Sequence, residues 1–163
     1  MLKKLLLKQK TKKNNIVRER FCTYQDAEEV GILFQEQEDL NGIEYLQSEL
    51  RADGKKVFLL MKVENYDKNK AYDFPFFYDK DVSISGNIES DTLDQFVNQS
   101  LDMLLILDEK PNPTTQYVIS KCQSLKIGCL TDINDIQHLD LIVQPKQSSK
   151  KYEELLSYLR KVA

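Results

Sequence analysis

The sequence is poor in the residues that mark well-known catalytic and cofactor motifs. Its 163 residues include 5 glycines, 3 cysteines, 1 histidine and no tryptophan. The glycines form neither Gly-x-Gly-x-x-Gly nor Gly-Lys-Ser or Gly-Lys-Thr, the patterns that let backbone approach a phosphate closely. The lone histidine, His138, lies in a loop, where histidines are more often solvent-exposed than catalytic, and no serine stands in Gly-x-Ser-x-Gly. The sequence therefore indicates no catalytic residue and no cofactor.

Cysteine usage and apolar run length bear on the compartment. Cys22, Cys122 and Cys129 are odd in number and include no Cys-x-x-Cys, which speaks against a disulfide framework or a zinc site. We interpret them as reduced thiols of a cytoplasmic protein. The apolar run Leu5–Leu7 is too short for the core of a signal peptide. No stretch approaches the ~20 apolar residues of a membrane span.

Charge is distributed unevenly along the chain. The net charge of −3 combines +7 over residues 1–20 with −10 over the remainder. This asymmetry predicts a basic N-terminal arm, residues 1–26, on a single α/β domain, residues 27–163. The side chains of the arm that we expect to bind a partner are Lys3, Lys4, Lys8, Lys10, Lys12, Lys13, Arg18 and Arg20.

The arm also has helical character. Leu2, Leu5 and Leu6 fall on one helical face among the lysines, and Asn14-Asn15 is expected to end the helix. A basic segment of this kind can bind RNA phosphates, free or in a ribonucleoprotein particle, or the head groups of an anionic membrane. The alternative interpretation is a solvated terminus without a partner.

The body is organised around Leu101–Asp108, a nearly unbroken apolar run that ends in acid. Such a run, followed by Pro111 and Pro113, is typical of a buried strand in a parallel sheet. Further strands are predicted at residues 30–34, 56–63, 126–130 and 139–143. Helices are predicted from apolar spacing and capping residues at 41–52, 90–99, 113–125 and 148–162.

This alternation predicts a doubly wound, mostly parallel sheet of about five strands in a three-layer α/β/α sandwich, flavodoxin-like or Rossmann-like. The expected strand order is 2-1-3-4-5, with Leu101–Asp108 beside the first strand. Phe74–Tyr78 could add a short edge strand, because Pro75 excludes a central one. We interpret its aromatic rings as satellite core beneath a loop, with stacking on nucleic-acid bases as the alternative.

Polar side chains follow the predicted strands where each one ends. Ligands of open α/β sheets bind beyond these carboxyl ends, so the residues could line a ligand-binding mouth. They are Glu36, Glu64, Asp108, Glu109, Thr131, Asp132 and Lys146. Hard cations such as Mg²⁺ take carboxylate ligands, which makes a magnesium-dependent or small-molecule site one interpretation. Ordinary solvated loop residues are the other, and we predict no metal site.

Several short motifs resemble those of an uncharacterised family of short bacterial α/β proteins, a domain of unknown function. The matching segments are Val30–Phe34, Gly54–Val57, Phe76–Asp81, Gly86, Phe96–Asn98, Leu101–Ile106 and Gln116-Tyr117. The sequence departs from the family near Gly86, where Ser83-Ile84-Ser85 stands in place of a bulkier aromatic. The resemblance implies the α/β fold and transfers no activity or catalytic residue.

Two classes of function follow from these patterns. The first, which we prefer at this level, is a non-enzymatic interaction module whose basic arm binds RNA or a ribonucleoprotein particle, with an anionic membrane as a rival partner. The second is a small-molecule or Mg²⁺-dependent site at the carboxyl ends of the strands. The sequence does not indicate an oligomeric state.

Overall fold

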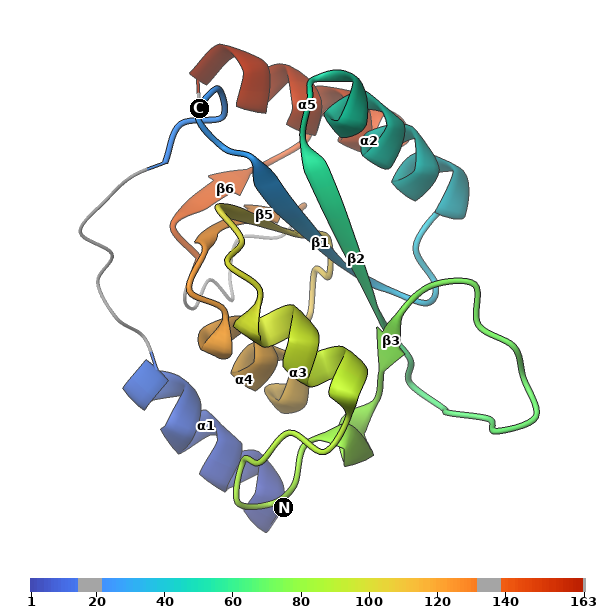
Figure 1. Cartoon of the computed structure of the whole chain (residues 1–163), viewed down its shortest axis with the longest axis vertical. Helices are drawn as coiled ribbons and strands as arrows, with labels where there is room; N and C mark the ends of the chain where they lie inside the picture. Colours follow the sequence, from blue (N-terminus) through green and yellow to red (C-terminus); the bar gives the residue numbers. More distant parts are fainter. Residues whose placement is uncertain (15–21, 132–138, 163) are drawn as a thin grey trace.

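A computed structural model describes residues 1–14, 22–131 and 139–162 of the chain. In this part, six parallel strands form one sheet in the order β3-β2-β1-β4-β5-β6 (Figure 1). The strands are β1 (Glu29–Gln35), β2 (Lys56–Lys62), β3 (Phe76–Phe77), β4 (Met103–Ile106), β5 (Leu125–Cys129) and β6 (Leu141–Val143). The helices are α1 (Leu2–Asn14), α2 (Leu40–Ala52), α3 (Asp91–Asn98), α4 (Pro113–Lys121) and α5 (Lys151–Val162).

The apolar run predicted as a central strand is β4, and all four of its residues are buried. It pairs with β1 on one side and β5 on the other, so the strand order reverses between β1 and β4. The sheet has six strands rather than five, because Phe76 and Phe77 pair with Met61 and Lys62 at the edge. A strand of two residues is too short to show a period-2 pattern. The sequence therefore did not decide whether Phe74–Tyr78 adds an edge strand to the sheet.

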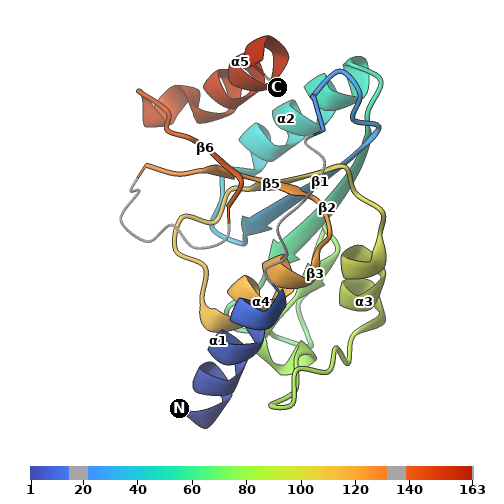
Figure 2. The same ribbon diagram turned by 90° about the vertical axis from the view of Figure 1, so that its left-hand side faces the viewer.

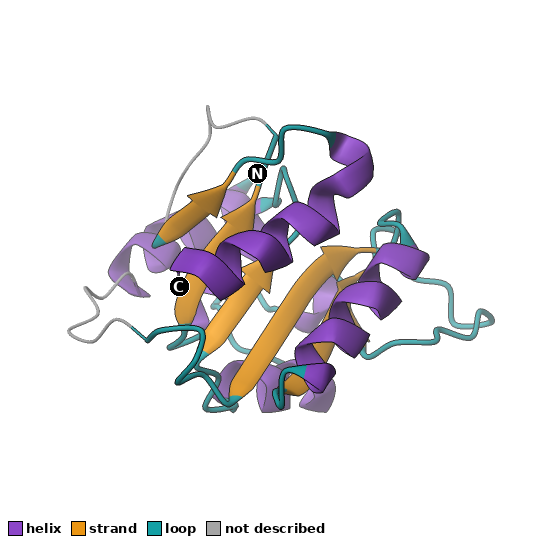
Figure 3. Cartoon of the chain, turned by 90° about the horizontal axis from the view of Figure 1, so that it is seen from above, coloured by secondary structure: helices purple, strands orange, loops and turns teal. Residues whose placement is uncertain are grey.

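Helices cover both faces of the sheet (Figure 3). On one face, Ile43 and Leu46 of α2 pack in the same buried cluster as Leu155 of α5. On the other face, Leu93 of α3 and Tyr117 of α4 belong to the second cluster. The helix starts follow the expected capping chemistry, since the side chains of their N-cap residues accept bonds from backbone N–H groups. These caps are Asp39, Ser90 and Asn112.

Helix α1 lies against α4 rather than on the sheet (Figures 1 and 2). Leu7 is fully buried in the same cluster as Tyr117, and the hydroxyl of Thr11, also buried, donates to the carbonyl of Leu7 at 2.7 Å. Leu2 and Leu5 remain exposed. The apolar face expected from the sequence therefore points largely to solvent. The helix packs on the body through a different face, which carries Leu7 and Thr11.

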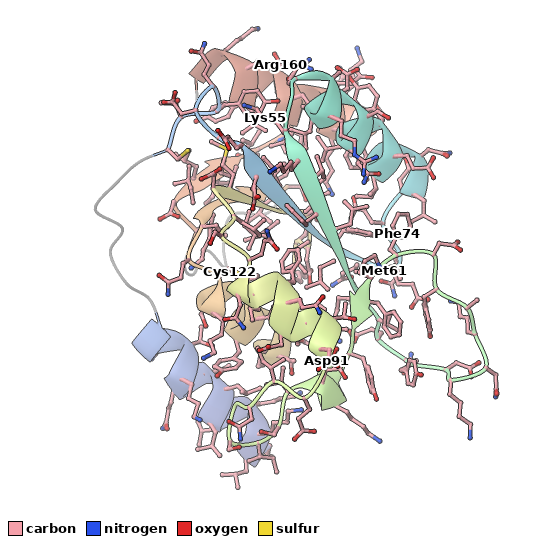
Figure 4. All side chains as sticks on the ribbon, in the orientation of Figure 1. Lys55, Met61, Phe74, Asp91, Cys122 and Arg160 are labelled. Carbon is pink, nitrogen blue, oxygen red and sulfur yellow. The ribbon has the colours of Figure 1, made fainter. Side chains whose placement is uncertain are left out.

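A buried lysine fixes the segment that leads into β1. Lys55 donates from Nζ to the carbonyls of Tyr24 and Ala27 at 2.6 and 2.7 Å, and it lies 4.6 Å from the centroid of the Tyr24 ring. The Tyr24 hydroxyl donates to Asp53 at 2.6 Å, and Arg160 of α5 binds the same carboxylate. Figure 4 labels Lys55 and Arg160. Within the described ranges, no helix is both long and apolar enough to cross a membrane.

Candidate functional site

The reversal of strand order brings three polar side chains into one row at the carboxyl ends of the strands. Gln35 ends β1 and is in register with Lys62 at the end of β2. On the other side, Asp108 follows β4, and the amide nitrogen Nε2 of Gln35 donates to its Oδ1 at 2.7 Å. In open α/β sheets this reversal is where ligands bind, because the flanking loops diverge and leave a crevice.

Asp108 is the most unusual group of the row. The residue is 2% exposed, and its Oδ1 also accepts the backbone N–H of Lys110 at 3.0 Å. Oδ2 is buried without a hydrogen-bond partner among the described residues. Burial raises the pKa of Asp108, because a low dielectric disfavours the charged form, and the hydrogen bond from Gln35 opposes that rise. A buried polar atom without a partner is rare and requires an explanation.

Asp108 borders a crevice of about 290 Å³. Its walls come from the loop after β1, the loop after β4 and the first residue of α5, and they include Glu38, Glu109, Lys110 and Lys151. The volume of the crevice lies at the lower limit for ligand pockets, near ~300 Å³, and most of its lining residues carry charged or amide side chains. The crevice therefore fits a small polar molecule.

One wall is held by a buried ion pair. Lys151 is 8% exposed, and its Nζ lies 2.7 Å from Oε1 of Glu38. The Tyr152 hydroxyl donates to the same oxygen at 2.6 Å. Burial and this bond to a carboxylate both raise the pKa of Tyr152. Lys151 and Tyr152 together fix the carboxylate of Glu38 in place. Lys151 does so from the start of α5, a position at which the helix dipole disfavours a positive charge.

The third member of the row is also a buried residue. Lys62 is 3% exposed, and its Nζ lies 3.0 Å from Oδ1 of Asp79 and 3.5 Å from Oε2 of Glu64. Asn112 also donates to Asp79, at 3.0 Å. Burial of Asp79 favours its neutral form, but the bonds from Lys62 and Asn112 outweigh it and hold the pKa of Asp79 below its usual range.

The structure divides the predicted mouth residues among several places. Asp108 and Glu109 border the crevice, and Glu109 accepts a 2.9 Å bond from the Thr131 hydroxyl. Glu36 instead pairs with Lys70. Three further residues of the predicted set have other positions. Glu64 pairs with Lys62, Lys146 is exposed with its backbone N–H bound to Glu154, and Asp132 lies outside the described residues.

The magnesium interpretation gains no support from this geometry. Across residues 1–14, 22–131 and 139–162, no three His, Cys, Asp or Glu side chains lie close enough to hold a metal ion.

The basic residues of the arm are likewise divided. Lys3 and Lys10 face the body: Lys3 donates to the carbonyl of Asp79, and Lys10 lies beside Gly86. Lys4, Lys8 and Lys12 are exposed. The remaining predicted residues, Arg18, Arg20 and the side chain of Lys13, lie outside the described part of the chain.

The aromatic rings of Phe74–Tyr78 form a packed group with Tyr66 and Tyr72 of the preceding loop. The ring of Tyr66 stacks on Tyr78 with a centroid distance of 4.6 Å, and Tyr72 lies 4.5 Å from Phe76. Phe74 packs edge-on against the buried ring of Phe34. These contacts match the interpretation as satellite core, because most of the rings are engaged with one another.

Sequence reasoning missed Glu38, Lys151 and Lys62 as parts of the site. Lys151 and Glu38 are 113 residues apart, and nothing local connects them. Two signals were nevertheless present: Lys62 interrupts an apolar strand between Met61 and Val63, and Lys151 opens a helix against the dipole. Each position is unfavourable for a lysine without a partner.

Comparisons with known proteins give one result. Neither a curated protein nor a solved structure matches the chain. A family model does match it over residues 1–162, which is almost its whole length. By this match the chain belongs to the Family of unknown function (DUF6913).

Proposed function

We propose that this protein is a binding module for a small polar molecule, held in the crevice between the loops that follow β1 and β4. The observation that carries the proposal is Asp108, which borders the crevice and whose buried Oδ2 has no described hydrogen-bond partner. The proposal includes a doubly wound, three-layer, Rossmann-like arrangement, in which this crevice is the expected ligand position. It also includes a cytoplasmic location, in keeping with buried thiols at Cys122 and Cys129.

The charges of the crevice restrict the ligand. An ionised Asp108 needs a hydrogen-bond donor at Oδ2, so the ligand brings a hydroxyl or an amine to that atom. Lys110 is exposed at the rim, whereas Lys151 is already paired with Glu38. An acceptor group on the other end of the ligand would bind Lys110. A molecule with a donor at one end and an acceptor at the other matches both sides of the crevice.

A thermal-shift screen of small polar metabolites tests this function. A compound that binds the native state raises the melting temperature, because it stabilises that state by RT ln(1 + [L]/Kd), where [L] is its free concentration and Kd its dissociation constant. We expect at least one hit, lost in Asp108→Asn, which converts Oδ2 or Oδ1 into a donor. Glu36→Gln is the matched control, since Glu36 lies outside the crevice walls. Hits that survive Asp108→Asn unchanged would place binding elsewhere and contradict the proposal.

A second candidate function is binding of an anionic partner through α1. The specific observation in its favour is the outward face of this helix, where Lys4, Lys8 and Lys12 lie exposed next to Leu2 and Leu5. At 3.6 residues per turn these five side chains share one side of the helix. Basic and apolar groups interleaved in this way suit an anionic surface, either RNA or lipid.

Substitutions on this face test the second candidate better than deletion of the arm, because deletion would uncover the contacts that Leu7 makes. The triple change of Lys4, Lys8 and Lys12 to Gln removes charge and leaves the inward face intact. If these three lysines reach phosphates, log affinity for duplex RNA should fall with log salt at a slope of about −3. Binding of anionic vesicles should require Leu5 as well, so Leu5→Asp separates lipid from RNA. Binding of both partners by the triple variant as tightly as by the wild type would exclude α1.

A further inference from the structure

The outer edge of β2 is only partly covered. Strand β3 pairs with Met61 and Lys62 alone, so no described strand lies beside residues 56–60 on that side. The direction of the backbone groups follows from the bonds at either end. Lys56 donates to Glu28 next to β1, whereas Met61 donates outward to Pro75. Because alternate residues of a parallel strand bond to opposite neighbours, Val57 and Leu59 direct their N–H and C=O groups to the open side.

This edge lies in a groove of about 740 Å³, the larger of the two hollows described here. One wall is α2, with Gln47 and Arg51, and the opposite wall is α3, with Gln95 and Phe96. The loop 64–75 leaves the sheet at the carboxyl end of β2 and does not run along this part of the strand (Figure 1). Phe74, which lies near Met61 in Figure 4, closes that end.

We propose that this groove binds an extended peptide segment of another protein, which adds a strand to the sheet beside β2. Main-chain bonds to Val57 and Leu59 would provide affinity, and alternate apolar side chains would contact Phe58 and Phe96. The uncovered stretch of five residues, 56–60, corresponds to about 17 Å of strand. The edge lies between two helices, so a single strand fits there better than the helix-flanked edge of a second copy.

Charge selects the direction of the peptide. Arg51 lies at the end of the groove where β2 begins, is exposed, and forms no ion pair with a described residue. Asp73 lies toward the other end, beside Phe74 and Pro75. A strand antiparallel to β2 places its carboxyl end near Arg51 and its amino end near Asp73. The groove therefore fits a peptide that is acidic toward its carboxyl end and basic toward its amino end.

Selection from a library of displayed linear decapeptides on the full chain tests this inference. We expect enriched sequences with alternating apolar residues and acidic residues toward the carboxyl end. The same selection on Arg51→Glu should favour basic residues toward the carboxyl end of the peptide. The peptides enriched on the wild type should bind that variant about threefold to tenfold more weakly. No enrichment over the bare support, or the same charge pattern on both proteins, overturns the proposal.

A second pair of variants separates backbone pairing from a general loss of fold. Val57→Pro removes one outward N–H without removing a bond to β1, whereas Val57→Thr keeps that N–H and the β-branched shape. The selected peptides should lose at least tenfold in affinity for Val57→Pro and bind Val57→Thr normally, with the melting temperature of each variant measured in parallel. Equal affinity for the two variants overturns strand addition. A dimer in sedimentation that only Val57→Pro dissociates would assign the edge to a second copy instead.

Discussion

Gln35 donates a 2.7 Å hydrogen bond to Asp108 across the pair of strands between which the sheet order reverses. The bond fixes one carboxylate oxygen of Asp108 and leaves the other buried without a described partner. A group in that state destabilises the fold, because its ionised form has lost water and has not replaced it fully. Proteins tolerate such local costs at functional sites, which is why this pair carries the proposed function.

The first prediction concerns the pH dependence that Asp108 confers. Burial raises its native-state pKa above the unfolded value, so the native state holds the proton over a range in which the unfolded chain has lost it. The free energy of unfolding should therefore fall as pH rises through that range. Asp108→Asn removes the charge and should be more stable than the wild type by roughly 1–2 kcal/mol at pH 7. Urea unfolding of both proteins from pH 4 to 8 measures the difference, which should shrink toward the acid end.

The second prediction concerns the central strand. Leu105 is fully buried in β4 between the helical layers, so Leu105→Ala removes burial and leaves a cavity. We expect a loss of about 2–5 kcal/mol in the free energy of unfolding. Leu5→Ala is the control, because Leu5 is 57% exposed and its truncation should change stability by less than ~0.5 kcal/mol. Similar losses in the two variants would show that β4 is not the centre of the core.

The features that the sequence predicted correctly are local ones. Leu101–Asp108 could be recognised as a strand because its apolar run and the following prolines lie within one short segment. The helix starts could be located because a cap needs a side-chain acceptor near the first turn, although the sequence did not choose between Asp39 and Asn41 or between Ser90 and Asp91. In the structure the caps are Asp39, Ser90 and Asn112. Such signals do not depend on distant parts of the chain, and the strand order then follows from the connection rules.

The features that it missed depend on tertiary contacts. Glu38 meets Lys151 across 113 residues, and Lys62 meets Asp79 only because β2 and β3 are neighbours. The orientation of α1 is a similar case. Its periodicity placed Leu2, Leu5 and Leu6 on one apolar face, but the residue that docking on α4 buries is Leu7, and Leu2 and Leu5 stay exposed. A basic helix with leucines on several sides does not specify which side faces the body.

The third prediction concerns the junction of α2 and α5. Arg160 donates to Asp53 at 2.8 Å and to Glu49 at 2.9 Å, and the bond from Arg160 is the main reason that the pKa of Asp53 is lowered. This stabilisation is present above the unfolded pKa of Asp53 and is lost as pH falls through the folded one. Because Arg160 is partly exposed and screened, Arg160→Ala should cost only about 0.5–1 kcal/mol at pH 7, and less in high salt. Lys161→Ala, an exposed change on the same helix, should show no such pH or salt dependence.

The last prediction concerns Lys62, the buried cation of the row that it forms with Gln35 and Asp108. Its Nζ lies 3.0 Å from Asp79 and also donates to the carbonyl of Val63 at 3.0 Å. Lys62→Met keeps an unbranched side chain one atom shorter and removes the charge. Asp79 then loses its cation, but its side chain is 51% exposed and can be hydrated, so we expect a loss of roughly 1–3 kcal/mol rather than the larger cost of a fully buried pair.

The pH profile shows whether that loss arises from the ion pair. Lys62 lowers the pKa of Asp79, so the stability that the pair contributes is present at neutral pH and disappears as Asp79 becomes protonated. The difference between wild type and Lys62→Met should therefore shrink on acidification through the native pKa of Asp79, and NMR titration should find that pKa raised in the variant. The variant should also raise the pKa of Asp108 further, since Lys62 is one of the charges that lower it. A loss independent of pH, with the Asp79 titration unchanged, would mean that Lys62 acts through packing of its aliphatic stem and not through its charge.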